Sequence, residues 1–452
     1  MNPSQGLVTS LNALREMSVQ SGSVYHQYVP VVDENTDIGT FGTPILNNSP
    51  VMNEFMSMLV NRIVYTQFLN KYYRNPLQVL EGDRIPLGYS GQELYTNPAQ
   101  ARQFNCNDFA GLLQRYTADV KVQYTSVNMD LQYCVTADRH KLKQAFVSWD
   151  NLDQFISELS NSLYNGAYID EYQYTKALVS SSFKSNQAQY IKVTAPTTDA
   201  TGKAFVKTLR TMFLNMKAPS SSYNAWAKVG GYGREIITWS NPEDIVFLIR
   251  NDVLANLDVD VLAVAFNMDK TTLLGNIIPV DNFDLYADDR VTKVYDGSNI
   301  LGFIGDKSWF RIKKQDMAFD EFYNPNNRTW QYYLNITKMY NYSLFANGVV
   351  IATDDPDVDV TSMEFVETGT VSAPVEVTVN ATKTLHIKTT PFSANETITY
   401  TSSDSTEVSV EAGTDNKTCV ITGVKAGTGN YITASTTSGA SATIYVDTIA
   451  AA

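Results

Sequence analysis

A long apolar stripe between Leu142 and Leu163 constrains the fold of this chain more than any other feature. Its members recur every three or four residues: Leu142, Ala145, Phe146, Trp149, Leu152, Phe155, Ile156, Leu159 and Leu163. This spacing places them on one face of a helix about six turns long. Polar residues such as Asp150 and Glu158 fall on the other face. The stripe predicts a core helix and contains no reactive group.

The same stretch contains a signal that interrupts a helix. Asn165-Gly166 is predicted to end the first helix. Asp170-Glu171 then place negative charge at the amino end of a second helix, which runs through Val179.

The first fifty residues divide into a short helix and a segment without periodicity. Leu7, Leu11 and Leu14 predict an amphipathic helix. Residues 21–50 are rich in Gly, Thr, Asn and Pro, and such a length is unusual for a loop in a compact domain. We therefore expect this arm to lie on a neighbour. Ser49-Pro50 predicts the start of the next helix.

Residues 71–107 predict an extended two-stranded excursion. Two short apolar runs, 77–80 and 85–89, are separated by turn residues including Glu81-Gly82-Asp83. A two-stranded hairpin is marginal alone, so we expect it to pack against something else. Alternation from Tyr116 to Tyr133 predicts one or two half-buried strands after it.

The middle of the chain predicts a mixed α/β unit. Residues 204–216 have helical spacing, and the apolar run 244–250 is typical of a buried strand. The other elements expected here are strands at 191–193, 276–281 and 301–313 and a helix at 251–267.

The composition changes after an acidic linker at Asp354-Asp355-Pro356-Asp357. From Val375 to Thr448 the chain is rich in threonine and lacks tryptophan. Seven short alternating runs occur there, separated by turn residues: VEVTV, LHIKT, TITYT, EVSVE, CVITGV, NYITAS and ATIYV. Regular short strands of this kind indicate an immunoglobulin-like sandwich.

Charge and cysteine content limit the class of protein. The formal net charge is -13, which argues against a surface that grips nucleic acid by neutralising many phosphates. The three cysteines, Cys106, Cys134 and Cys419, lie far apart, as expected of free thiols in a reducing compartment. We expect neither a secretory signal nor a membrane span.

The sequence predicts no active site, no metal site and no cofactor. His26, His140 and His386 lie in separate segments, and no nucleophile has a base nearby in sequence. Gly202-Lys203 lacks the other residues of a phosphate loop, and we interpret Gly230-Gly231-Tyr232-Gly233 as a turn. Three carboxylate clusters remain, and a solvated acidic face or linker explains each better than a cation site or a glycosidase: Asp258-Asp260, Asp281-Asp284-Asp288-Asp289 and Asp354 to Asp359.

Several long stretches resemble the major capsid proteins of short-tailed phages of the picovirus type, whose shells have the Hong Kong 97 phage fold. The matching residues cover about 10–352 and include FVSWDNLDQFISELSNSLYNGAYIDEYQY, NPLQVLEGDRIPLGYSGQELYTN, LDVDVLAVAFNMDKTTLLGNIIPVDNF, DKSWFRI and RTWQYYLNITKMYNYSLFANGVV. The resemblance implies an α+β shell domain at 51–353, preceded by an amino-terminal arm at 1–50. Within the shell domain it implies an extended loop at about 71–107, a peripheral domain with a spine helix at about 142–183, and an axial domain at about 215–350.

The tail after a linker at 354–372 resembles a group 2 bacterial immunoglobulin-like domain, at 373–452. The matching residues are Thr390-Pro391, Thr399 to Asp404, Ile421 to Thr428 and Ile432-Thr433-Ala434. Tyr400 stands where that family usually has Trp, and the glycine expected near Lys383 is missing.

The resemblance to capsid proteins implies a structural protein, not an enzyme. Its copies would form pentamers and hexamers in an icosahedral head that encloses double-stranded DNA without sequence-specific binding. Scaffolding protein and portal would be further partners, and assembly would occur in the host cytoplasm. The immunoglobulin-like domain would either project outward and contact the host surface weakly or act as a stabilising cap between capsomers. Some relatives join a lysine of the extended loop to a neighbour's asparagine, but this chain has no lysine from Tyr72 to Val120, so we expect no isopeptide bonds. The alternative from another class is a surface adhesin or glycan-processing protein with an immunoglobulin-like module.

Overall fold

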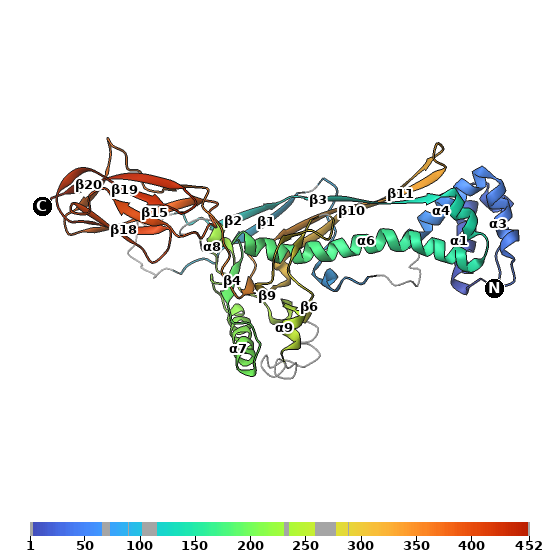
Figure 1. Cartoon of the computed structure of the whole chain (residues 1–452), viewed down its shortest axis with the longest axis horizontal. Coiled ribbons are helices and arrows are strands. Elements are labelled where there is room, and N and C mark those ends of the chain that lie inside the picture. The colour runs from blue at the N-terminus through green and yellow to red at the C-terminus, as the bar shows by residue number, and fades with distance from the viewer. Residues whose placement is uncertain are drawn as a thin grey trace. The chain divides into compact units, whose positions relative to one another are not determined.

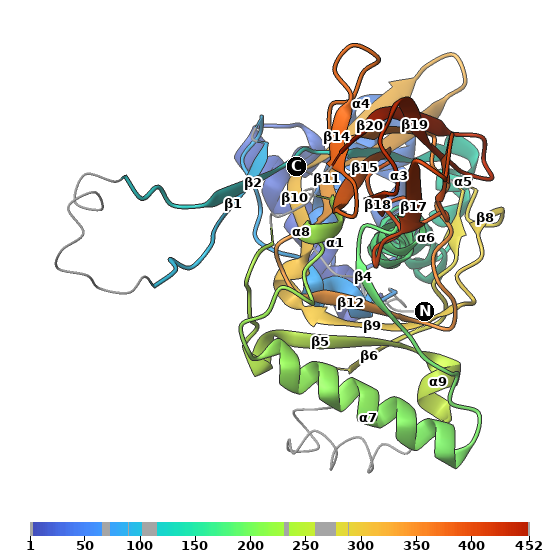
Figure 2. The ribbon, with the colours of Figure 1, turned by 90° about the vertical axis from the view of Figure 1, so that its left-hand side faces the viewer.

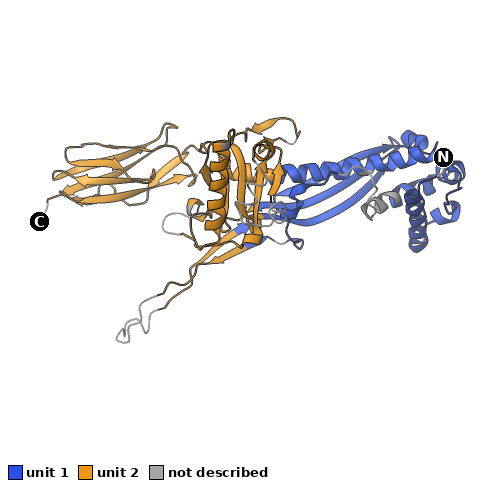
Figure 3. Ribbon diagram, turned by 90° about the horizontal axis from the view of Figure 1, so that it is seen from below, with its two compact units in different colours: residues 1–92, 124–175, 311–341 blue, residues 93–123, 176–310, 342–452 orange. Residues whose placement is uncertain are grey.

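The computed structural model describes residues 3–65, 73–88, 90–101, 115–229, 235–257, 277–287 and 289–450. These residues form two compact units, which Figure 3 shows in different colours. Unit 1 comprises residues 1–92, 124–175 and 311–341, and unit 2 comprises 93–123, 176–310 and 342–452. One helix, α6 (Trp149–Lys184), and four strands, β1 (Gly91–Thr96), β2 (Val120–Thr125), β10 (Phe310–Asn324) and β11 (Thr329–Tyr342), continue from one unit into the other, so each unit is described by itself.

Unit 1 contains a three-stranded sheet with a long helix beside it (Figure 1). The strands are β3 (Met129–Asp138), β10 (Phe310–Asn324) and β11 (Thr329–Tyr342), in the order β10-β11-β3. Strand β11 is antiparallel to β3, with Trp330 opposite Ala137 and Ile336 opposite Leu131. Alternate β11 side chains are buried in one cluster with the apolar face of the helix, which accounts for the alternating pattern of the strand.

The helix α6 (Trp149–Lys184) is continuous over 36 residues, so the predicted interruption at Asn165-Gly166 is wrong. A glycine inside a helix costs only about 1 kcal/mol relative to alanine, and packing on both sides of this point outweighs that cost. Ala167 is buried in the core, and the Asn165 side chain accepts a hydrogen bond from the backbone N–H of Tyr73 at 3.0 Å. The predicted start at Leu142 instead belongs to a separate helix, α5 (Arg139–Ala145).

The amino-terminal residues form four helices: α1 (Gln5–Ser21), α2 (Tyr25–Tyr28), α3 (Ile38–Asn47) and α4 (Ser49–Tyr65). The first and last confirm the predicted helices. Residues 21–50, predicted to lack regular structure, instead contain α2 and α3 and pack against the chain's own core. Tyr25, Phe41 and Ile45 are buried in the same cluster as the apolar face of α6, and the Phe41 ring lies 5.4 Å from that of Trp149.

The excursion exists, but its strands are not the predicted ones. Residues 77–80 belong to a short 3-10 helix, η1 (Pro76–Leu80), and residues 85–88 form no strand. The paired strands are β1 (Gly91–Thr96) and β2 (Val120–Thr125), and residues 81–86 precede them as the base of the excursion. Strands β2 and β3 confirm the prediction of half-buried strands over 116–133.

Unit 2 contains a five-stranded mixed sheet in the order β4-β12-β9-β5-β6. Its strands are β4 (Gln189–Lys192), β5 (Ile245–Arg250), β6 (Ile277–Val280), β9 (Ile300–Asp306) and β12 (Gly348–Ala352). Helix α7 (Asp199–Met216) covers one face of this sheet (Figure 2). Successive β5 residues are all buried, which explains a run that is apolar without alternation.

Shorter elements complete this part of unit 2. They are α8 (Trp226–Val229), η3 (Pro242–Asp244), α9 (Asn251–Ala255), β7 (Leu285–Tyr286), β8 (Lys293–Tyr295) and η4 (Lys307–Trp309). The predicted strands at 191–193, 244–250 and 276–281 and the helix at 204–216 are confirmed. The single strand predicted at 301–313 is wrong, because η4 divides it into β9 and the first residues of β10, which belong to different sheets. The remainder of the helix predicted at 251–267 lies outside the described residues from 258 onward.

The carboxyl-terminal residues form two four-stranded sheets around a core of their own. One sheet has the order β13-β15-β18-β17 and the other β14-β20-β19-β16. The strands are β13 (Ser362–Phe365), β14 (Val375–Thr378), β15 (Thr382–Thr390), β16 (Thr399–Ser402), β17 (Val408–Ala412), β18 (Thr418–Gly423), β19 (Gly427–Ser435) and β20 (Ser441–Ile449). All seven predicted strands are confirmed. The eighth, β13, lies inside the segment predicted to be a linker, so that segment belongs in part to the folded domain.

Cys134 and Cys419 are free thiols, whereas Cys106 lies outside the described residues. Among the helices in the described part of the chain, none is long and apolar enough to cross a membrane.

Candidate assembly surfaces

The excursion is fastened to strand β10 at its base in unit 1. The backbone N–H of Gly82 donates to the carbonyl of Ile312 at 2.8 Å, and that of Ile85 donates to the carbonyl of Lys314 at 3.0 Å. The Arg84 side chain bonds the Gln315 carbonyl at 3.0 Å. These bonds hold residues 81–86 alongside β10 although the two segments are far apart in sequence.

A buried lysine reinforces the same base. Lys338 on β11 is only 3% exposed, and its Nζ lies 3.0 Å from Glu81 Oε1 and 2.6 Å from Glu171 Oε1. Glu81 belongs to the base of the excursion and Glu171 to α6. One ammonium group therefore joins three segments, and burial strengthens each attraction because little water screens it.

Burial and the charged groups around Lys338 shift the pKa values of two neighbouring residues. Burial raises the pKa of Tyr340, and the nearby Glu171 and Glu81 carboxylates raise it further. Burial, followed by repulsion from Lys338, lowers the pKa of Lys314. The cavity lined by Glu171, Lys338 and Tyr340 has a volume of only about 10 Å³, which is too small for a substrate.

The other end of the excursion is held within unit 2. The Asn97 side chain donates to the Glu235 carbonyl at 2.9 Å and accepts from the backbone N–H of Ile237 at 3.2 Å. Tyr95 Oη donates to the carbonyl of Ile237. Asn97 also donates to Asp119 Oδ2 at 2.8 Å, which ties the two arms of the excursion together.

Between these anchors the strands β1 and β2 expose apolar side chains. Figure 2 shows the two strands side by side as a narrow ribbon. Leu94 is 60% exposed and Tyr124 is 75% exposed, while Val120 is also exposed. No β1 residue is buried in the described chain. Large apolar side chains on a ribbon with so little core are typical of a surface that another molecule covers.

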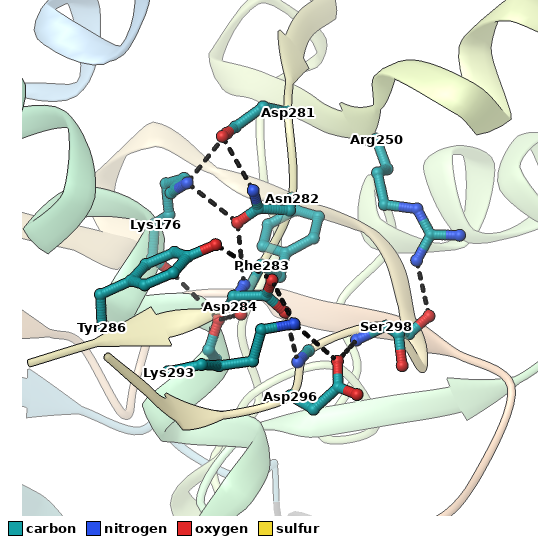
Figure 4. Close-up of polar contacts among 12 residues, drawn as sticks. Lys176, Arg250, Asp281, Asn282, Phe283, Asp284, Tyr286, Lys293, Asp296 and Ser298 are labelled. Atoms are coloured by element: carbon teal, nitrogen blue, oxygen red, sulfur yellow. Dashed lines mark hydrogen bonds and ion pairs between the residues drawn. The ribbon is translucent and has the colours of Figure 1, made fainter. Parts of the chain in front are cut away.

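A second buried lysine fastens the carboxyl-terminal part of α6 within unit 2 (Figure 4). Lys176 is fully buried, and its Nζ donates to Asp281 Oδ1 at 2.9 Å and to Asn282 Oδ1 at 3.1 Å. Burial lowers the pKa of Lys176, and the hydrogen bond to Asp281 opposes that shift.

The contacts continue from Asn282 to a neighbouring turn. Asp284 accepts a hydrogen bond from the backbone N–H of Gly297 at 2.9 Å, and its Oδ2 lies 2.9 Å from the Nζ of Lys293. A Cβ on Gly297 would lie 2.2 Å from the Phe283 carbonyl, so only glycine fits there. These contacts hold residues 281–284 against α6 and join them to Lys293 and Gly297.

The candidate catalytic residues from the sequence are not brought together. His26 Nδ1 lies 3.2 Å from Ser18 Oγ, His386 Nδ1 lies 2.7 Å from Glu367 Oε1, and His140 begins α5. Among the carboxylates, Asp281 and Asp284 face lysines, while Asp355 faces Lys192 at 3.3 Å. Within the described ranges no group of His, Cys, Asp and Glu could hold a metal ion. Gly230 to Gly233, Asp258, Asp260 and Asp288 lie outside the described residues.

The positions of both buried lysines in the sequence indicate buried ion pairs, although a search for catalytic motifs does not find them. Lys338 occupies an inward position of β11, in step with the buried Leu334 and Ile336. Lys176 lies four residues after Tyr172 and three before Val179 on a buried helix face. A lysine at such a position predicts a buried ion pair, because an isolated buried charge is very costly.

Comparison with known proteins identifies relatives over most of the chain. The family model described as Phi29-like phage major capsid protein matches residues 11–352. The major capsid protein of Bacillus phage B103 is 29% identical over 407 residues, which is 89% of this chain and 84% of that protein. The major capsid protein of Bacillus phage PZA is 30% identical over 355 residues, 78% of this chain and 75% of that protein.

A solved structure shows the fold. The chain in "Capsid structure of Staphylococcus phage Andhra" aligns with a TM-score of 0.52 and 14% identity over 64% of this chain and 87% of that chain. The long helix beside a sheet and the second, mixed sheet therefore share the fold of that phage capsid chain, which is Hong Kong 97-like. The chain belongs to the Phi29-like phage major capsid protein family. It is a bacteriophage structural protein of the virion capsid and not an enzyme, which confirms the prediction and decides against the adhesin alternative.

Proposed function

We propose that copies of this chain form pentamers and hexamers, which close into an icosahedral head around double-stranded DNA. Membership of the capsid family, together with the exposed apolar side chains of the excursion, supports this assembly. Head-to-tail contacts close into rings when the rotation per subunit allows it. Each contact is repeated many times in a shell, so modest contacts suffice.

Paired substitutions in the excursion test this assembly. We expect Leu94→Asp with Tyr124→Asp to leave the subunit folded, because neither side chain is buried, and to prevent closed shells. Val291→Asp is the matched control, since Val291 is 79% exposed and lies outside the excursion. Electron microscopy of the two assembly reactions measures the difference. Normal shells from the double variant would contradict a tying role for the excursion.

We also infer that the carboxyl-terminal domain is immunoglobulin-like. The strand orders β13-β15-β18-β17 and β20-β19-β16 correspond to the A-B-E-D and G-F-C sheets of that fold, with β14 added beside β20. The core includes Leu385 and Ile421 from one sheet and Ile432 and Ile444 from the other. We propose that this domain projects from the shell and contacts the host surface weakly.

Removal of residues 354–452 tests the division into shell and accessory domain. Because the domain has its own core, we expect the shortened chain still to form heads, with reduced attachment to host cells. Heads that fail to form would show that the domain instead stabilises contacts between capsomers.

We further propose that the shell assembles in the host cytoplasm with a scaffolding protein and a portal, and without covalent links between subunits. The lack of lysine from Tyr72 to Val120 supports the last point. Mature particles should give a single monomer band on a denaturing gel. A ladder of multimers would disprove this. Assembly with and without each partner gene tests the other two proposals.

A further inference from the structure

The outer face of helix α7 carries a basic stripe on an otherwise acidic protein. Lys203, Lys207, Arg210, Leu214 and Lys217 lie at intervals of three and four residues. At 3.6 residues per turn these positions fall within about 80° of arc, on a single line along the helix. We call Lys203, Lys207, Arg210 and Lys217 the basic stripe.

The opposite face of α7 fixes the direction of this stripe. Phe205, Leu209, Met212, Phe213 and Met216 are buried in the cluster that includes alternate residues of β5. The stripe residues are exposed. Figure 2 shows α7 lying across the sheet with its other side directed away from the strands. The cations therefore face away from the described sheet on which α7 packs.

The charges of the stripe are not compensated locally. Within the described part of the chain, Lys203, Lys207 and Arg210 form no ion pair, and Lys217 lies over the ring of Phe213 at 4.6 Å. Asp199 at the start of α7 is the only acidic residue of the helix. A surface of one sign on a chain of net charge -13 needs a separate explanation.

We propose that the basic stripe binds the phosphate backbone of the enclosed duplex DNA. Cations along a helix are the usual electrostatic footprint of nucleic-acid binding. A neighbouring protein surface is a poorer match, because lysine is depleted in protein interfaces and three of the four cations are lysines. The stripe contains no aromatic or amide side chain that could read a base. This proposal rests on the proposed enclosure of DNA. It assigns the DNA contact to one basic helix of a chain whose net charge is negative.

The first test measures DNA binding by the unassembled full chain. The variant K203Q/K207Q/R210Q removes three cations of the stripe, and K141Q/K143Q/K383Q removes three exposed cations elsewhere. A 30-base-pair duplex is titrated by fluorescence anisotropy from 50 to 200 mM salt. Each phosphate contact contributes about 0.9 to the slope of log K against log salt, so the stripe variant should lose about 2.7 in slope and on the order of 10²-fold in affinity at the lowest salt.

Further variants and a second duplex separate the outcomes. The control variant should keep the slope of the unmodified chain, K203R/K207R should also keep it, and a duplex of unrelated sequence should bind equally. Equal loss in both glutamine variants, or no salt-dependent binding by the unmodified chain, would overturn the proposal. Unchanged DNA binding with failed shell assembly would assign the stripe to a neighbouring subunit and would also overturn it.

The second test asks whether the stripe meets DNA in filled heads. Formaldehyde cross-linking followed by mass spectrometry should place DNA adducts on Lys203 and Lys207 and not on Lys141 and Lys143. Adducts at other lysines without any on α7 would contradict the proposal. Because binding in solution does not require shells, failure of this inference can be distinguished from failure of the proposed assembly, which is scored separately by electron microscopy.

Discussion

Two buried lysines anchor this protein, and their partners differ in access to water. The partners of Lys338 in unit 1 are themselves shielded, with Glu81 and Glu171 side chains 21% and 12% exposed. The Asp281 side chain that faces Lys176 in unit 2 is 47% exposed. When a lysine is lost, a shielded carboxylate stays buried without a counter-charge, whereas an exposed one is hydrated. The partner's exposure, more than the lysine's, therefore sets the free-energy cost of breaking each anchor.

The largest effect is expected from Lys338→Met. Removing one partner of a buried ion pair typically costs about 3–5 kcal/mol, and this change leaves two carboxylates unpaired. Amide hydrogen exchange in β3 and β11 should report a local opening free energy lowered by that amount. Lys143→Met on the exposed side of α5 is the control and should change little.

A triple variant tests whether the uncompensated carboxylates cause this loss of stability. Lys338→Met with Glu81→Gln and Glu171→Gln removes every charge of the anchor, so we expect it to regain most of the lost stability. If the triple variant is no more stable than Lys338→Met alone, the uncompensated carboxylates are not the source of the cost.

A smaller effect is expected from Lys176→Met. The change removes charge-assisted hydrogen bonds worth about 1.5–3 kcal/mol, but Asp281 can then be hydrated. Exchange should quicken in the last turns of α6, up to Lys184. A loss equal to that of Lys338→Met would contradict the role given to partner exposure.

The parts of the fold that the sequence predicted are those in which the pattern itself is local. Each strand of the carboxyl-terminal domain alternates within its own run, so all seven could be found from the sequence. The helices within residues 21–50 could not be predicted, because their folding depends on contacts with residues far away in sequence. Gly42 resembles a loop residue, yet a Cβ there would lie 2.8 Å from the Phe146 ring, so it is a packing glycine. The Trp149 indole N–H donates to the Thr36 carbonyl at 3.1 Å.

The partners of the two lysine anchors could not be predicted from the sequence for a related reason. A lysine on an inward position indicates that a partner exists, but only the fold shows which carboxylate it is. Glu81 lies more than two hundred residues before Lys338, and no spacing rule connects them. Residues 81–83 were therefore predicted as a turn and the following residues as a strand, whereas both belong to a segment whose backbone is bonded to β10.

The smallest effect is expected at Glu396 of the carboxyl-terminal domain, a partly exposed carboxylate whose hydrogen-bond partners are neutral groups. Its carboxylate accepts hydrogen bonds from Thr437 Oγ1 and the backbone N–H of Ser438 at 2.6 Å, and from the backbone N–H of Val360 at 2.9 Å. Bonds from the Thr437 hydroxyl and the Val360 and Ser438 groups lower the pKa of Glu396 to about 2 from an ordinary 4.5. A lowered carboxyl pKa stabilises the fold above the unfolded value, and this stabilisation is lost as the pH falls from 4.5 through about 2.

Glu396→Gln should therefore lower the melting temperature of the fragment 354–452 near neutral pH and flatten its decline between pH 4.5 and 2. Glu411→Gln, at an exposed position of β17, is the control and should keep the decline. Circular dichroism melts across this pH range measure both. Because glutamine can still accept hydrogen bonds at this partly exposed position and leaves no buried charge without a partner, the change near neutral pH should be smaller than at either buried lysine. A larger loss at Glu396 than at Lys176 would show that the number of hydrogen bonds, and not shielding from water, decides how firmly a charged anchor holds this protein.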